Sequence, residues 1–159
     1  MFFNTLQKTL RYHRKEASGQ KWIGFKQYPR LEFLKEMREV AEQVKDRSLN
    51  DGFFKAGRFV YPDFARTLVG KSIFAIANNN FLDVVRLAPR GYAAANKYGK
   101  AEVSVPYDNC VQLSLENVWD PMPFSAGICQ GVLDLFHIDP IKFEVEQSAL
   151  AHVTFRITY

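Results

Sequence analysis

The spacing of apolar residues changes once along this chain, and this change constrains the fold more than any other feature. Before Gly99, apolar residues recur at every third or fourth position, as they do along one face of a helix. After Gly99 they alternate with polar residues, which is the pattern of a half-buried strand. Four such segments follow, and in each the alternating apolar residues would lie on one face of a strand. These residues are Ala101, Val103 and Val105; Val111, Leu113 and Leu115; Ile141, Phe143 and Val145; and Val153, Phe155 and Ile157.

One helical segment separates the second of these strands from the third. Its apolar face carries Ile128, Val132 and Phe136, and Gly127 and Gly131 lie four residues apart on it. That glycine spacing leaves one face without side chains, so another backbone can approach closely. The order strand, strand, helix, strand, strand after residue 99 predicts an antiparallel sheet with one inserted helix.

The part before Gly99 predicts helices. An amphipathic pattern covers residues 2–14, and a second one runs from Pro29, placed to open a helix, to Val44. A third apolar stripe over residues 53–69 is interrupted by Pro62, which fits one kinked helix or two short ones. We therefore expect an α+β fold of one domain over 1–159. In it, N-terminal helices over 1–99 pack on a four-stranded antiparallel sheet with an inserted helix over 100–159.

The last helical segment contains residues that do not favour a helix. The stretch "FLDVVRLAPRGYAAANKYG" carries Pro89, which removes a backbone donor, and Gly91, which loosens the following turn. Arg86 and Arg90 lie on either side of the proline. The sequence predicts a bend, which either opens a pocket or lets the helix follow the sheet.

Composition supports a large apolar core, and the charge is uneven. Hydrophobic residues make up 47% of the chain and include 14 phenylalanines, which either fill the core or line a cavity. The net charge is +4, and part of the excess lies near the N-terminus. This basic segment is either a solvated surface or a weak contact for an anionic surface, and no nucleic-acid-binding motif accompanies it. Its residues include Lys8, Arg11, Arg14 and Lys15.

Motifs of common enzymes are absent from the sequence. There is no glycine-rich phosphate loop, nucleophile elbow or metalloprotease motif, and His13, His137 and His152 are isolated. Cys110 and Cys129 fit no metal spacing and are expected to be small buried residues. No leader peptide and no membrane-spanning stretch is recognised. These observations predict a cytoplasmic protein without a metal or cofactor.

Three segments resemble a known group of proteins. "FKAGRFVYPDFARTLVGKSIF", "VVRLAPRGYAAANKYG" and "FSAGICQGVLDLFHI", with the closing pair of strands, resemble a paralogous family of unknown function expanded in myxobacteria. The shared features include the step from Thr67 to Lys71 and the pair Asn96 and Tyr98. The wider architecture is similar to a ligand-binding superfamily that contains haem-nitric-oxide/oxygen (H-NOX) domains, 4-vinyl-reductase-type domains and TRAPP vesicle-tethering subunits.

The resemblance implies a place for a ligand between the helices and the sheet, and it argues against haem. In haem-binding members, the helix before the sheet carries the histidine that ligates the iron. Here that stretch reads Arg86, Leu87, Ala88, Pro89, Arg90, and no histidine occurs between residues 14 and 136. The Tyr-x-Ser-x-Arg motif that holds the haem propionates is also missing, because the matching strand reads "VQLSLEN".

These observations lead to one functional hypothesis and two alternatives. We expect a non-enzymatic sensory or regulatory domain that binds a small amphipathic or anionic ligand in an apolar cavity, without haem. The alternatives are a TRAPP-subunit-like protein-interaction module with a filled core, and an enzyme that uses Tyr92 or Tyr98 as an acid. A homodimer or a protein partner is expected in either non-enzymatic case. The candidate ligand-binding residues are Phe59, Phe64, Phe74, Tyr92, Arg66, Arg86 and Arg90.

Overall fold

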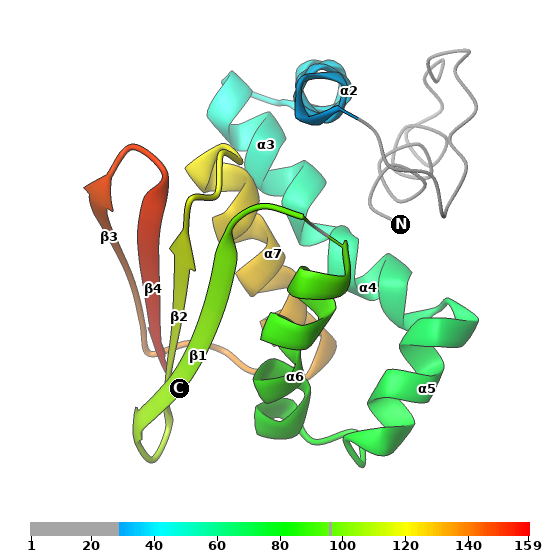
Figure 1. Cartoon of the computed structure of the whole chain (residues 1–159), viewed down its shortest axis with the longest axis vertical. Helices are drawn as coiled ribbons and strands as arrows, with labels where there is room; N and C mark the ends of the chain where they lie inside the picture. The colour runs from blue at the N-terminus through cyan, green and yellow to red at the C-terminus, as the bar shows by residue number, and fades with distance from the viewer. Residues whose placement is uncertain (1–28, 96) are drawn as a thin grey trace. The chain divides into compact units, whose positions relative to one another are not determined.

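The computed structural model describes residues 29–95 and 97–159 (Figure 1). Within these residues the chain forms helices and one four-stranded antiparallel sheet with a helix inserted between its strand pairs, which confirms the expected α+β class. The chain divides into two compact units. The first extends up to Phe64 and includes Pro121–Val132, and the second comprises Ala65–Asp120 and Leu133–Tyr159. The assignment of the whole chain to one domain remains a prediction.

Several sequence-based predictions lie outside the described residues. They are the helix over 2–14, the basic residues Lys8, Arg11, Arg14 and Lys15, the histidine His13 and the motif residue Asn96.

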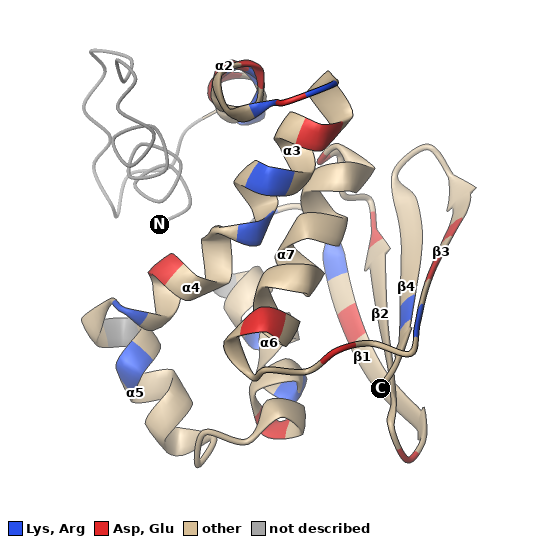
Figure 2. Cartoon of the chain, turned by 180° about the vertical axis from the view of Figure 1, so that it is seen from behind, with Lys and Arg blue, Asp and Glu red and all other residues tan. Residues whose placement is uncertain are grey.

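Helix α2 (Arg30–Val44) opens the described part of the first unit. The prediction that Pro29 is its first residue is off by one position, because Pro29 precedes the helix in an extended conformation. Phe33, Met37 and Val40 are buried at the expected spacing of three or four residues. Charged side chains occupy other positions on the helix (Figure 2).

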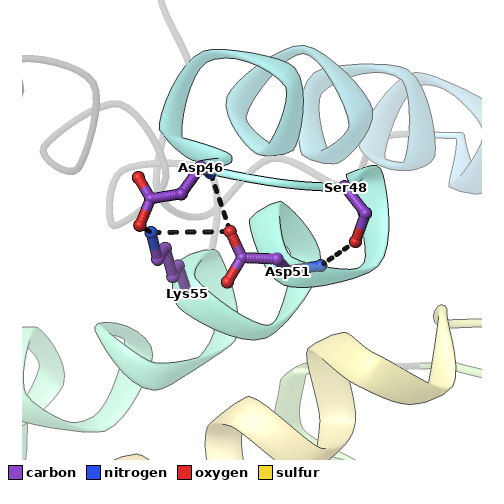
Figure 3. Close-up of polar contacts among 4 residues, drawn as sticks. All are labelled: Asp46, Ser48, Asp51 and Lys55. Atoms are coloured by element: carbon purple, nitrogen blue, oxygen red, sulfur yellow. Dashed lines mark hydrogen bonds and ion pairs between the residues drawn. The ribbon is translucent and has the colours of Figure 1, made fainter.

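Polar contacts fix the connection from α2 to α3 (Leu49–Arg58), as Figure 3 shows. The backbone N–H of Asp51 donates to Ser48 Oγ at 3.2 Å, so Ser48 caps the helix. Asp51 Oδ2 accepts from the backbone N–H of Asp46 at 2.8 Å and lies 3.5 Å from Lys55 Nζ, which also pairs with Asp46. The Asp46 N–H, assisted by Lys55, lowers the pKa of Asp51 below its ordinary value. The turn therefore favours the ionised carboxylate.

The apolar stripe over 53–69 forms more helices than expected. It contains the end of α3, all of α4 (Val60–Ala65) and the start of α5 (Leu68–Ile76), so the prediction of one kinked helix or two short ones is wrong. Pro62 lacks the N–H that would bond to the carbonyl four residues earlier, which explains the break after Arg58. The backbone N–H of Gly70 donates to Thr67 Oγ1 at 3.0 Å and starts a new helix.

Backbone packs directly against backbone in the first unit. The part of α7 (Met122–Leu135) up to Val132 belongs to this unit. A Cβ on any of three glycines of α3 and α7 would overlap a carbonyl oxygen of the other helix, so only glycine allows this approach. A Cβ added to Gly57 would lie 2.1 Å from the carbonyl oxygen of Phe124. A Cβ added to Gly127 would lie 2.1 Å from the carbonyl oxygen of Phe54, and one added to Gly131 would lie 2.2 Å from that of Arg58.

A fourth glycine brings α3 equally close to α2. A Cβ on Gly52 would lie 2.0 Å from the carbonyl oxygen of Ala41. Phe124 is 1% exposed beside these contacts, and its ring meets that of Phe33 edge to face at 6.5 Å. The core of the first unit consists of the buried residues Phe33, Met37, Val40, Ala41, Val44, Phe53, Ala56, Val60 and Phe124.

The second unit contains the sheet. Its strands are β1 (Lys100–Tyr107), β2 (Cys110–Glu116), β3 (Lys142–Ala149) and β4 (His152–Thr158), in the spatial order β1-β2-β4-β3, with every pair antiparallel. Helix α6 (Phe81–Ala95) contacts β1, and the two join at Gly99, whose φ of +82° favours glycine. The expected four-stranded antiparallel sheet is therefore confirmed.

The strand register gives the sheet one apolar and one polar face. Val103 pairs with Leu113, which pairs with Phe155, so these side chains share a face. On the opposite face, Ser114 and Thr154 are hydrogen-bonded at 3.2 Å, and Arg156 donates to Gln112 at 3.3 Å. This alternation follows the sequence pattern.

Strand β3 departs from its predicted pattern. Phe143 and Val145 pair with Ile157 and Phe155 and so share their face as expected, although Val145 is 40% exposed; Ile141 precedes the strand and is 81% exposed, so the prediction is wrong for that residue. Phe143 does contact Phe155, with ring centroids 6.1 Å apart. Because β3 is an edge strand, its outer positions need fewer apolar contacts than those of β4. Among residues 29–95 and 97–159, no helix has the length and apolar character needed to cross a membrane.

The glycine contacts predict opposite effects for two alanine substitutions. Gly127→Ala forces α3 and α7 apart and should lower the free energy of unfolding by about 1–3 kcal/mol. Gly91→Ala in α6 is the control, because a Cβ there meets nothing within 4 Å, and alanine should stabilise the helix by about 0.5–1 kcal/mol. Thermal unfolding followed by circular dichroism measures both changes. Equal melting temperatures for the two variants would contradict the packing described.

Candidate functional site

Four aromatic rings form a cluster within the second unit. The ring of Phe136 stacks on Phe74 with centroids 5.9 Å apart and meets Phe81 edge to face at 5.6 Å. Phe81 in turn meets Tyr159 edge to face at 5.1 Å. Both geometries are favourable for aromatic pairs, worth about 0.5–1.5 kcal/mol each beyond area burial. We call Phe74, Phe81, Phe136 and Tyr159 the aromatic cluster.

Local structure at the ends of elements brings the cluster together. Phe74 lies on α5, and Phe81 is the first residue of α6. Asn78 and Asn79 between them have φ values of 49° and 52°, a left-handed conformation that asparagine tolerates better than most residues. Asn80 Oδ1 accepts from the backbone N–H of Asp83 at 3.2 Å and caps α6. The three asparagines thus end α5 and start α6.

The other two rings follow α7 and β4. Phe136 lies in the turn after α7, where its backbone N–H donates to the carbonyl of Leu133 at 3.1 Å, and the backbone N–H of Tyr159 donates to the carbonyl of Asn109 at 2.9 Å. Phe74 and Phe81 are buried, whereas Phe136 and Tyr159 are half-buried. The cluster is thus closed on the α5 side and partly accessible at Tyr159.

Arg86 adds a positive charge near the accessible ring. Burial, and to a smaller extent the nearby Cys110 thiol, raises the pKa of Tyr159 above its ordinary value, while Arg86 acts in the opposite direction. Arg86 Nη1 lies 3.3 Å from Asp83 Oδ1, in a pair whose side chains are both more than 40% exposed. An exposed pair of this kind contributes little to stability, so Arg86 can exchange Asp83 for another anion at small cost.

One of the predicted ligand-binding residues, Phe74, is a member of this cluster, and a second, Arg86, acts electrostatically on Tyr159. Two others lie elsewhere in the same unit. Tyr92 is half-buried and its hydroxyl donates to the carbonyl of Tyr98 at 3.4 Å, next to the junction at Gly99. Arg90 is exposed on α6, one turn after Arg86.

The remaining predicted residues are not part of the aromatic cluster. Arg66 is exposed in the turn before α5. Phe59 and Phe64 belong to the first unit, where both are half-buried and Phe64 meets Tyr61 edge to face at 6.0 Å. Whether these residues line a ligand site remains a prediction.

Helix α6 continues through Pro89 and Gly91 and ends at Ala95. The proline therefore does not terminate the helix, although the carbonyl of residue 85 cannot receive its usual N–H donor. The bend expected from the sequence remains a prediction.

Sequence reasoning missed three members of the cluster, although a signal existed for each. Tyr159 continues the alternation of Val153, Phe155 and Ile157 and therefore shares their face. Phe136 lies on the apolar face recognised for α7. Phe81 follows the asparagine cap directly, a position where an apolar residue begins the buried stripe of a helix.

Groups able to bind metal or act as nucleophiles are not assembled in the described part of the chain. Within residues 29–95 and 97–159, no three or more histidine, cysteine, aspartate or glutamate side chains are grouped as metal ligands. His152 is exposed on β4, and His137 is exposed just after α7 with a φ of 54°. Burial raises the pKa of Cys129 to about 12, so its thiol stays protonated at neutral pH.

Solved structures similar to this chain are H-NOX domains. An oxygen-binding H-NOX domain related to soluble guanylate cyclases superposes with a TM-score of 0.70 at 12% identity, over 98% of this chain and 85% of that one. An H-NOX protein from S. oneidensis in the Fe(II) ligation state gives a TM-score of 0.65 at 14% identity, over 99% and 93%. A mutant H-NOX of T. Tengcongensis gives 0.65 at 12%, over 98% and 87%.

At identities of 12–14%, the TM-scores show a shared H-NOX-like fold and no more. A comparison with curated proteins gives no match. The model of a family described as "Protein of unknown function (DUF2378)" matches residues 1–159. The chain therefore belongs to the DUF2378 family.

Proposed function

We propose that this chain is a non-enzymatic sensory or regulatory domain that binds a small amphipathic anion without haem. One observation carries the proposal. The chain has an H-NOX-like fold, but its helix before the sheet, α6, contains Arg86 and Arg90 and no histidine. In haem-binding members of the superfamily that the sequence resembles, this helix supplies the iron ligand. An arginine in its place favours a ligand with a carboxylate or phosphate group.

The aromatic cluster supports the amphipathic character of the ligand. Tyr159 is half-buried, so an aliphatic tail can contact its ring and extend toward Phe81. Arg86 lies close enough to influence the Tyr159 hydroxyl, and an anionic head group there can displace Asp83. A charge-assisted hydrogen bond to a guanidinium is worth about 1.5–3 kcal/mol. The aromatic cluster, which would contact the tail, and Arg86, which would contact the head group, both belong to the second unit.

The environments of the described tyrosines and of Cys129 support a binding role over an enzymatic one. The Tyr92 hydroxyl donates to a backbone carbonyl, and Tyr98 is 77% exposed. In the first unit, burial raises the pKa of Tyr61 to about 12, and the thiol of Cys129 is also kept protonated. A general acid or nucleophile acting near neutral pH needs a pKa much closer to 7.

A second candidate is a protein-interaction module, in which the rings fill the core and no ligand enters. The contacts of 5.1–5.9 Å among the four rings favour this alternative, because each ring already packs on another. In that case self-association as a homodimer, or a protein partner, supplies the function. Light scattering over micromolar concentrations, with and without an amphiphile, distinguishes the two. The mass of a ligand-binding domain should stay constant as the protein concentration rises, with or without the amphiphile. The mass of an interaction module should rise with protein concentration alone.

The absence of a histidine from α6 predicts that the protein does not bind haem in the manner of H-NOX domains. Purified protein mixed with haem should show no sharp Soret band in its absorption spectrum. A sharp band that is lost on substitution of His137 or His13 would show that another histidine ligates the iron. Any sharp band, whether or not it survives these substitutions, would contradict the proposal.

Binding of dodecanoate tests the role assigned to Arg86. Arg86→Ala should weaken binding at least about tenfold, because a charge-assisted bond is lost and each 1.4 kcal/mol is a factor of ten. The melting temperature should barely change, because the Asp83 pair is exposed. Isothermal titration calorimetry measures the affinity. The matched control is Arg156→Ala, which removes an exposed arginine from the polar face of the sheet and should leave the affinity unchanged.

Two outcomes would count against this site. If the two alanine variants bind dodecanoate equally, the head group does not contact Arg86. If Arg86→Ala lowers the melting temperature by several degrees and the wild type binds neither fatty acids nor aromatic carboxylates, the arginine is structural and the interaction module is favoured.

A further inference from the structure

Helix α5 presents two unlike faces. At 100° per residue, Gly70, Phe74 and Ala77 at its end fall within an arc of about 60°, and all three are buried. Leu68, Ser72, Ala75 and Ile76 fall within an arc of about 100° on the opposite side, and all four are exposed. The exposed side is thus mainly aliphatic, with the small residues Ser72 and Ala75 between two large ones.

The two large residues are almost fully accessible. Leu68 is 83% exposed and Ile76 is 75% exposed. They lie about 12 Å apart along the helix at 1.5 Å per residue. A single exposed aliphatic residue is normal on a protein surface, but two on one helical stripe form a surface suited to contact with another apolar phase.

The charged residues of α5 and of the turn before it are all basic. Lys71 is exposed about 60° from Leu68 around the helix, and Arg66 is exposed in the turn that precedes it. No aspartate or glutamate occurs from residue 64 to residue 82. Figure 2 accordingly shows basic residues, and no acidic one, on α5 and in the turn before it. A stripe of aliphatic side chains bordered by cations matches the boundary between acyl chains and anionic head groups.

We propose that α5 docks on the surface of an anionic phospholipid bilayer. Leu68 and Ile76 insert at the level of the head groups, and Lys71 and Arg66 contact lipid phosphates and carboxylates. This activity is independent of the ligand site proposed above, because it uses the face of α5 opposite Phe74.

A second copy of the chain fits this face less well than a bilayer does. In an antiparallel pairing of α5 with itself, centred on Ser72, the two Lys71 side chains come close together, and α5 offers no carboxylate to neutralise them. Like charges in proximity oppose such an interface. An anionic lipid surface compensates the same lysines.

Co-sedimentation with lipid vesicles tests the proposal. The full chain should bind vesicles of phosphatidylcholine containing 30 mol% phosphatidylserine and bind pure phosphatidylcholine much more weakly. The double variant Leu68→Ser, Ile76→Ser should lose about tenfold or more of this binding, because the inserted apolar area is removed. Lys71→Gln should lose about fivefold, and the difference between it and wild type should shrink at high salt.

The matched control is the double variant Ile141→Ser, Leu150→Ser. It removes two side chains of the same unit that are 81% and 78% exposed, and it should bind like wild type. A second measurement looks for a signal that appears on binding to vesicles, instead of for a loss of binding. Ile76→Trp adds a tryptophan on α5 to Trp22 and Trp119, and the difference between its emission and that of wild type should shift to the blue when phosphatidylserine vesicles are added.

Three results would overturn the proposal. They are failure of the wild-type protein to sediment with anionic vesicles, a loss of binding in the control as large as in the α5 variant, and an unchanged Ile76→Trp difference emission on vesicles. Concentration-dependent dimers that dissociate in Leu68→Ser, Ile76→Ser, without vesicle binding, would assign the same face to a second copy instead.

Discussion

The direct approach of backbone to backbone between α3 and α7 is the contact on which the first unit depends. Gly57, Gly127 and Gly131 each face a carbonyl oxygen of the other helix at a distance that excludes a Cβ. These three positions fix both the separation of the helices and their register, because a shift by one residue would place a side chain against a carbonyl. Phe124 is then enclosed beside the crossing and contacts Phe33 of α2. Close packing of this kind tolerates little change in volume.

The sequence predicted those features whose signal lies within one element. The alternation after Gly99 is set by contacts of neighbouring strands, and it correctly placed Val153, Phe155 and Ile157 on a buried face. The spacing of Gly127 and Gly131 correctly indicated a close backbone approach, although it did not identify α3 as the partner. Breaks in the helical part were harder to predict. Thr67 caps the start of α5 through its hydroxyl, and a single capping residue inside an apolar stripe is easily overlooked.

The candidate site could be predicted only in part because its members come from the ends of four elements. Phe74 and Arg86 were both among the predicted residues; Phe74 is a member of the aromatic cluster, and Arg86 acts electrostatically on Tyr159. Phe136 and Tyr159 join them through long-range contacts that depend on the turn after α7 and on the register of β4. Phe59 and Phe64 were selected by the same reasoning and belong to the other unit. Periodicity thus identifies which face of an element is apolar, but not which other element covers it.

The H-NOX-like fold and the composition of α6 together lead to the central claim, that this member of the DUF2378 family uses an arginine-bearing helix to hold an amphipathic anion instead of haem. Native mass spectrometry of protein purified gently from haem-replete cells tests this claim most directly, because it weighs whatever the folded chain retains. The account predicts a retained organic anion that is released on denaturation and is reduced in Arg86→Ala. Stoichiometric haem in the same spectrum would contradict it.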